Sequence, residues 1–141
     1  MLRTAVFKIL PVLVVIFSFP VLALAQTSTD PSLAYANRKN RVPQLSDKDR
    51  KYFDKQYQTK CSRCHGKEGN GKGNKSGDGP RAADFTDAKF MGTLTDGQVF
   101  YQIEKGGEEN SAMPAFGPGS SHGWSEEKIW KMVRYIRLFA R

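Results

Sequence analysis

Both cysteines of this 141-residue chain lie in one pentapeptide, Cys61-Ser62-Arg63-Cys64-His65. The C-x-x-C-H spacing is the attachment signature of c-type haem. Cysteines three residues apart lie on one side of a helical turn, where each can form a thioether with a haem vinyl group, and the following histidine lies beneath the iron. The pentapeptide therefore predicts one haem c, attached through Cys61 and Cys64 and ligated axially by His65.

Three other uses of a C-x-x-C pair are possible, and each lacks something in this sequence. A zinc site needs further Cys or His ligands, of which only His122 remains. A thioredoxin-like redox pair needs a βαβ context, whereas the residues after the pentapeptide are rich in glycine. A simple disulfide does not account for the adjacent histidine, which would have no chemical role. The histidine therefore favours covalent haem.

The first 25 residues are typical of a secretory signal peptide. Arg3 and Lys8 form a basic start, residues 9–25 are almost wholly apolar, and the segment ends in Ala23-Leu24-Ala25. We expect cleavage after Ala25 and export to the bacterial periplasm, which agrees with a chain whose two thiols are both used for thioethers. The alternative is an uncleaved membrane anchor that faces the periplasm, which two prolines in the apolar run disfavour.

Residues 26–45 form a polar segment with no sustained apolar period. The segment contains two prolines and the basic run Arg38-Lys39-Asn40-Arg41. We predict a linker or flexible arm, in which the basic run is a solvated charge cluster rather than a contact with a membrane or a partner. The domain itself is expected to span residues 46–141.

Three stretches of this domain carry a helix start followed by apolar residues at helical spacing. Ser46, Thr95 and Ser125 are the expected N-caps, each followed by acidic residues in the first turn. The first helix should run into the pentapeptide, and the second should end at Gly106-Gly107. Glycines in residues 66–83 argue against regular structure there, and no strand pattern is present, so we expect an all-α domain. The apolar stripes of the three helices are Tyr52, Phe53 and Tyr57; Val99, Phe100 and Ile103; and Ile129, Val133 and Ile136.

Met113 is the predicted sixth ligand of the iron. It lies in the loop Ser111-Ala112-Met113-Pro114-Ala115-Phe116, where the proline can restrict the approach of the ligand. A thioether opposite histidine favours ferrous iron and raises the reduction potential. We interpret Met91 and Met132 as packing residues. His122 is the other possible ligand, although a loop histidine is more often solvated.

The order of these elements resembles that of class I c-type cytochromes, and it is most similar to the cytochrome c subunit domains of cbb3-type oxidases. The resemblance covers residues 45–141. The matching elements are Cys61-Ser62-Arg63-Cys64-His65-Gly66, Gly77-Asp78-Gly79-Pro80, Asp84-Phe85-Thr86-Asp87, Met113-Pro114-Ala115-Phe116, and the helix with Trp130, Val133 and Tyr135-Ile136-Arg137. It implies a small class I cytochrome c fold, in which three main helices and long loops wrap around one covalent haem.

The resemblance also implies roles for individual residues. The Pro80 carbonyl is expected to accept a hydrogen bond from Nδ1 of His65, which fixes the tautomer of the ligand. Tyr57 is expected to pack on the last helix near Tyr135. Phe53 departs from the family, because many members have a small residue there, and its ring is expected to widen or shift the crossing of the first and last helices.

The predicted function is one-electron transfer between redox partners, with no catalytic residue, so the chain is not expected to be an enzyme. One alternative is a fixed electron-transfer subunit of a larger oxidoreductase complex. The other is a haem peroxidase or gas sensor, in which the sixth position is open to a ligand.

Charge bears on the partners of the chain. Removing two of the 22 basic residues with the signal, and none of the 14 acidic ones, leaves a net charge of +6. Basic residues near the pentapeptide have two equal interpretations: a rim that steers redox proteins with acidic docking surfaces, or a surface that only keeps the protein soluble. Nucleic acid is not an expected partner of an exported haem protein, and a membrane is expected only if the N-terminal segment is retained. The basic residues of the rim are Lys60, Arg63, Lys67, Lys72 and Lys75.

Overall fold

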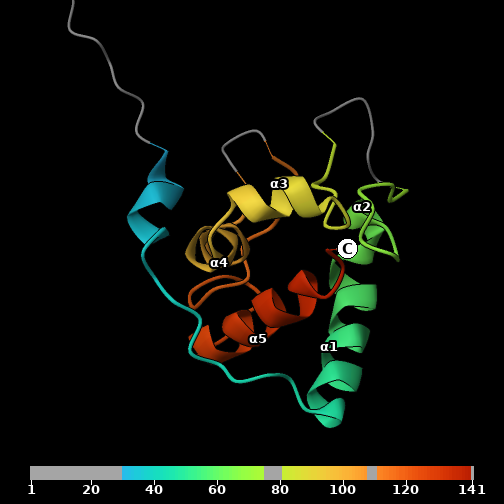
Figure 1. Cartoon of the computed structure of the whole chain (residues 1–141), viewed down its shortest axis with the longest axis horizontal. Helices are drawn as coiled ribbons and strands as arrows, with labels where there is room; N and C mark the ends of the chain where they lie inside the picture. Colours follow the sequence, from blue (N-terminus) through green and yellow to red (C-terminus); the bar gives the residue numbers. More distant parts are fainter. Residues whose placement is uncertain (1–29, 75–80, 108–110, 141) are drawn as a thin grey trace, which may run out of the picture.

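The computed structural model describes residues 30–74, 81–107 and 111–140, and this part of the chain is helical (Figure 1). Its elements are the 3-10 helix η1 (Pro31–Tyr35) and the α-helices α1 (Asp47–Lys60), α2 (Ser62–His65), α3 (Ala88–Thr93), α4 (Asp96–Lys105) and α5 (Glu126–Arg137). No strand occurs among these residues, which confirms the all-α prediction. Within the described ranges no helix is both long and apolar enough to cross a membrane, and the expected signal segment lies outside them.

Polar N-caps begin the three main helices at the positions that the sequence predicted. Ser46 before α1 and Ser125 before α5 each accept a hydrogen bond from the backbone N–H three residues on. Thr95 before α4 forms a reciprocal capping box with Gln98. Gly106 follows the last turn of α4 with φ at 82°, a value that favours glycine. The starts of the main helices, and the end of α4, therefore follow from local side-chain and glycine chemistry.

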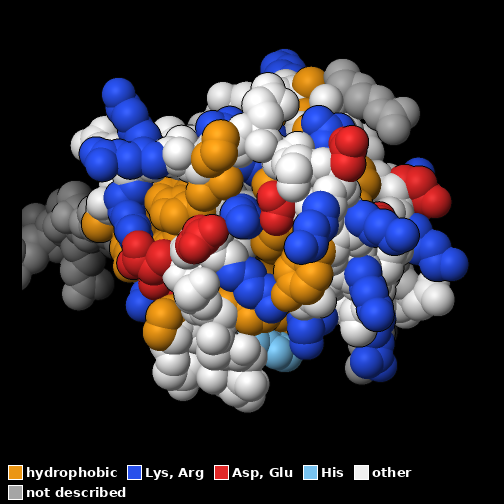
Figure 2. All heavy atoms as spheres, turned by 90° about the horizontal axis from the view of Figure 1, so that it is seen from below, with side chains coloured by type: hydrophobic (Ala, Val, Ile, Leu, Met, Phe, Trp, Pro, Cys, Tyr) orange, Lys and Arg blue, Asp and Glu red, His pale blue; other side chains and the backbone are white. Residues whose placement is uncertain are grey.

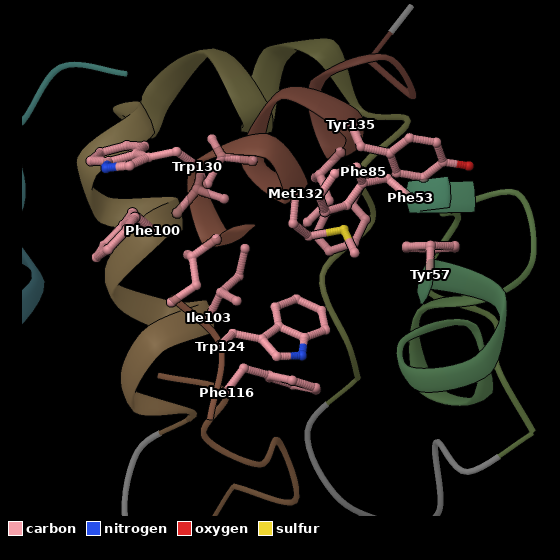
Figure 3. Packing of buried hydrophobic residues seen from close by; sticks show 14 of the residues in the cluster. Phe53, Tyr57, Phe85, Phe100, Ile103, Phe116, Trp124, Trp130, Met132 and Tyr135 are labelled. Carbon is pink, nitrogen blue, oxygen red and sulfur yellow. The ribbon is translucent and has the colours of Figure 1, made fainter. Parts of the chain in front are cut away.

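Helix α5 packs against both α1 and α4 and so joins the two sides of the molecule (Figure 1). Figure 3 shows its buried side chains between those of α1, such as Phe53 and Tyr57, and those of α4, such as Phe100 and Ile103. Phe53 is 2% exposed, and the shift in helix crossing that we expect from its ring stays a prediction. The buried residues of α5 are Ile129, Trp130, Met132, Val133, Tyr135 and Ile136.

The predicted packing roles of the other methionines are confirmed, since Met91 and Met132 are each 1% exposed in the core. Tyr52, by contrast, is 45% exposed and lies at the edge of the apolar stripe of α1. The Lys128 ammonium group lies 5.4 Å from the centre of the Tyr52 ring, a cation–π contact at the surface.

Two short helices were not predicted from the sequence. Helix α1 ends at Lys60, and Cys61 separates it from the single turn of α2. Helix α3 begins after Asp87, whose side chain accepts a hydrogen bond from the N–H of Phe90 at 2.9 Å. Both helices are too short to show an apolar period, so only the N-cap of α3 could have indicated one of them.

The segment predicted to be a linker packs against the domain from Asp30 onward. We call residues 30–45 the N-terminal strap; η1 lies beside α4, and the strap then passes α5 to reach the start of α1 (Figure 1). The Asn40 amide donates to the Trp130 carbonyl at 3.1 Å, and the Arg134 guanidinium donates to the Val42 carbonyl at 3.1 Å. Single side chains and polar contacts hold the strap on the domain. Its packing could therefore not be predicted from a repeat of apolar residues.

Candidate haem site

The pentapeptide lies at the junction of α1 and α2. Cys61 is the residue between the two helices, and Cys64 and His65 lie in the turn of α2. The N–H of His65 donates to the Cys61 carbonyl at 3.0 Å, which closes this turn. Cys61 is half-buried against the hydrophobic core, and burial raises the pKa of its thiol to about 12. One turn of helix thus carries both thiols and the imidazole, as the spacing predicted.

The imidazole of His65 is held both at its Nδ1 atom and in its ring plane. Nδ1 lies 3.1 Å from the carbonyl oxygen of Ala83. A carbonyl can only accept, so Nδ1 carries the proton and Nε2 keeps a lone pair for a metal. The Phe85 ring stacks on the imidazole, with centroids 4.4 Å apart and planes 17° from parallel. Burial also lowers the pKa of His65, which favours the neutral form that can ligate a metal.

This hydrogen bond differs from the one that the resemblance implied. The acceptor in the structure is the Ala83 carbonyl, three residues beyond the expected Pro80. Pro80 itself lies outside the described residues. The physical role is unchanged, because any backbone carbonyl at Nδ1 fixes the same tautomer of His65.

Backbone contacts of the glycine-rich loop bring Ala83 and Phe85 to the histidine. The N–H of Phe85 donates to the Gly69 carbonyl at 2.7 Å. Gly71 has φ at 69°, and a Cβ there would lie 2.7 Å from the Ala82 carbonyl oxygen. A glycine is therefore needed where these two stretches of loop approach each other.

Tyr57 ties α1 to the loop and to α5. Its hydroxyl donates to the Gly66 carbonyl at 2.8 Å, immediately after the pentapeptide. Its ring lies 5.8 Å from that of Tyr135 and 4.9 Å from that of Phe139, so the expected packing near the last helix is observed. Burial raises the pKa of Tyr57, which keeps its hydroxyl a neutral donor.

Backbone hydrogen bonds tie the Met113 segment to the end of α4. The Met113 carbonyl accepts from the N–H of Gly107 at 3.1 Å, and the N–H of Phe116 donates to the Ile103 carbonyl at 3.0 Å. A Cβ at Gly106 would lie 2.7 Å from the Met113 carbonyl oxygen. Gly106 therefore ends the helix and also makes room for the methionine segment.

The side chain of Met113 is half-buried against the same hydrophobic cluster that Cys61 contacts. Phe116 and Trp124 are 3% and 4% exposed, and in Figure 3 their rings lie at the lower edge of this cluster. His122 stacks on Phe116, with centroids 4.3 Å apart and planes 12° from parallel. The structure thus places the predicted sulfur ligand in an apolar setting.

These residues fit a covalently attached haem. The two thiols of one helical turn suit thioether formation with vinyl groups, and the adjacent imidazole presents an Nε2 lone pair. The aromatic and thioether side chains around the cluster suit an apolar macrocycle. Cys61, Cys64 and His65 would hold the group through their thiols and imidazole.

A family model described as "Cytochrome C oxidase, cbb3-type, subunit III" matches residues 53–136. The chain belongs to this family. It is a c-type cytochrome, an electron-transfer protein whose cofactor is haem c. The match contains the pentapeptide and the Met113 segment, and it begins after the N-terminal strap.

Two solved structures are similar to the cytochrome. The "KustC0563 c-type cytochrome" is 28% identical, with 62% of this chain and 96% of that chain covered and a TM-score of 0.50. A chain of the "Kuenenia stuttgartiensis reducing HAO-like protein complex Kustc0457/Kustc0458" is 23% identical, with 73% and 49% covered and a TM-score of 0.55. The cytochrome therefore spans about half of that second chain, and this likeness shows the fold alone. No curated protein matches the cytochrome.

Three residues of the site were not predicted from the sequence. Ala83 acts through its backbone carbonyl, for which a side chain gives no signal. Phe85 lies in the element Asp84-Phe85-Thr86-Asp87 that matched the family, and this was the available signal for it. Gly106 was predicted only as a helix end, and its second role depends on the tertiary approach of Met113.

Replacing Gly106 by alanine tests its role beside Met113. Gly119→Ala is the matched control, because Gly119 has φ at 86° but a Cβ there would meet no atom within 4 Å. Each variant carries backbone strain of about 1–3 kcal/mol. Gly106→Ala should lose about 1–3 kcal/mol more, from the clash with the methionine segment. Urea denaturation of the haem-loaded cytochromes measures both, and equal losses would contradict the close-approach argument.

Proposed function

We propose that the cytochrome is a mono-haem one-electron carrier whose iron is ligated by His65 and Met113. The observation that carries this proposal is the anchoring of both ligand segments by backbone hydrogen bonds. The His65 ring is fixed through Ala83, and the Met113 segment is fixed to the end of α4. Ligands held in this way change position little between two charge states, which suits electron transfer.

When bound, the haem supplies an iron that alternates between the ferric and ferrous states. His65 donates its Nδ1 proton to the Ala83 carbonyl, which increases the basicity of Nε2. As a ligand, the Met113 thioether would favour the ferrous state and raise the reduction potential. Phe116 and Trp124 exclude water from this side of the site, which favours the state of lower charge.

The variant Met113→Ala tests the sixth ligand. We expect loss of the weak band that sulfur-ligated ferric haem shows at the red end of the visible spectrum. The reduction potential should fall by a substantial part of the about 0.8 V range that axial ligands set. Met91→Leu is the control, because it replaces a methionine buried in the core by a residue of similar volume and should leave the spectrum and the potential unchanged. An unchanged spectrum and potential in Met113→Ala would refute the ligand assignment.

We also propose that the cytochrome meets redox proteins through a positive surface, and that these partners present acidic docking surfaces. Four residues of the predicted rim are exposed: Lys60, Arg63, Lys67 and Lys72, whereas Lys75 lies outside the described residues. Figure 2 views the other end of α1 and shows that Lys and Arg side chains also gather on the side of the molecule where α1 lies. Positive potential on this side would speed the encounter with an acidic partner.

Charge reversal at Lys60 and Lys67 tests this docking surface. Oxidation of the reduced cytochrome by anionic hexacyanoferrate(III) should slow by roughly tenfold at low salt, and the difference should vanish at high salt. Oxidation by a cationic cobalt complex should not slow. Lys39→Glu and Arg41→Glu together form the control, with the same change in net charge at two exposed residues of the strap. Equal slowing in the control would assign the effect to net charge and contradict a local docking surface.

For the location of the cytochrome, we propose the periplasm, with cleavage after Ala25. The support is the basic start, the apolar run and the small-x-small end of residues 1–25. Mass spectrometry of the haem-loaded protein from a periplasmic extract should give a chain that starts at Gln26. Recovery only in the membrane, with residues 1–25 retained, would contradict this.

The second candidate function is an electron-transfer subunit of a larger oxidoreductase, which the family description supports. Stoichiometric recovery of the cytochrome with a larger subunit would favour this candidate.

A further inference from the structure

The N-terminal strap lies outside the family match, yet it makes specific contacts with the domain. Arg38 is central to these contacts, because its guanidinium lies 4.5 Å from the centre of the Phe100 ring and 5.5 Å from that of Trp130. It also pairs with Glu126 at 2.9 Å. A Cβ at Gly97 would overlap the Tyr35 carbonyl oxygen, so only glycine in α4 allows this approach. The strap is therefore docked in one position.

The docked strap makes a polar contact with a buried carboxylate. The Tyr35 hydroxyl donates to Oε2 of Glu104 at 3.0 Å. Glu104 is 9% exposed, and its other partner is the Lys105 ammonium group at 3.3 Å. Lys105 is itself 53% exposed, so its interaction with the carboxylate is screened by water. Tyr35 thus provides the hydrogen bond that links the Glu104 carboxylate to the strap.

Glu104 connects this contact to the segment that carries Met113. Its backbone carbonyl accepts from the N–H of Gly117 at 3.0 Å. A Cβ at Gly117 would lie 2.5 Å from Cγ of Glu104, so the glutamate side chain packs directly on this part of the loop. One residue therefore contacts the strap through its carboxylate and the methionine segment through its stem and its backbone.

We propose that Tyr35 and Glu104 are positioning residues for Met113, so that the strap sets how firmly the sulfur occupies the sixth position of the iron. This inference rests on the proposed His65 and Met113 ligation. If the Tyr35 hydroxyl is lost, the Glu104 carboxylate lacks this donor, and turning toward water lowers its free energy. Its stem then leaves Gly117, and the loop that holds Met113 is no longer packed on that side.

Imidazole binding to the ferric, haem-loaded cytochrome measures this effect, because imidazole competes with the sulfur for the iron. Its apparent affinity rises with the fraction of molecules in which Met113 is dissociated. Tyr35→Phe and Glu104→Ala should raise this affinity by roughly tenfold, which is within the effect of losing one hydrogen bond to a charged group. Glu104→Gln keeps an acceptor for Tyr35 and should restore most of the native affinity.

Lys105→Ala is the matched control, since it removes the exposed partner of the same carboxylate and should leave imidazole affinity unchanged. Thermal unfolding of each variant is recorded in parallel. A loss of stability in Tyr35→Phe and Glu104→Ala with native imidazole affinity would mean that the strap only stabilises the fold, and would overturn the proposal. Failure of the ligand assignment is a separate result, because it is read from Met113→Ala in the unaltered strap background.

Discussion

The packing of α5 between α1 and α4 is the constraint on which the rest of the structure depends. The histidine segment continues directly from α1, and the methionine segment is hydrogen-bonded to the end of α4. Helices α1 and α4 are joined chiefly through their common contacts with α5. The separation of the two segments that carry the proposed ligands is therefore set by the side chains that α5 buries. In a close-packed interior these side chains cannot shift independently, so the two sides of the site are fixed with respect to each other.

The segments that carry the two proposed ligands are held mainly by backbone groups. The Ala83 carbonyl orients His65, and carbonyls at the end of α4 receive the loop that carries Met113. Such contacts require the chain to approach itself closely, which explains the glycines at positions 71 and 106. A backbone carbonyl is also a fixed dipole that does not titrate, so it holds the histidine tautomer over a wide range of pH.

This use of the backbone explains what could be predicted from the sequence. The attachment pentapeptide, the N-caps Ser46, Thr95 and Ser125, and the burial of α5 follow from local spacing and side-chain chemistry. The acceptor at Ala83 could not be predicted, because every residue offers the same carbonyl and only the folded loop selects one. The strap was missed for a related reason. Its contacts with the domain join residues more than sixty positions apart, such as Tyr35 and Glu104. Local sequence patterns do not indicate such pairs. An apolar period identifies a helix face that packs continuously, whereas the strap is held at a few separate points.

The residues that would bind the haem are distinct from the residues that the N-terminal strap contacts. Residues 53–136 hold the haem attachment sequence and both proposed ligands, so the chemistry of the site belongs to the shared domain. The described contacts of the strap are with residues of this domain outside the attachment sequence and the two proposed ligands, among them Phe100, Trp130 and Glu104. In the proposed coupling through Glu104, a change in the strap alters how tightly the Met113 loop is held, while the proposed ligand atoms stay the same. If Met113 is the sixth ligand and the strap positions it through Glu104, as we propose, then a sequence outside the family match adjusts the iron without altering the residues that bind it.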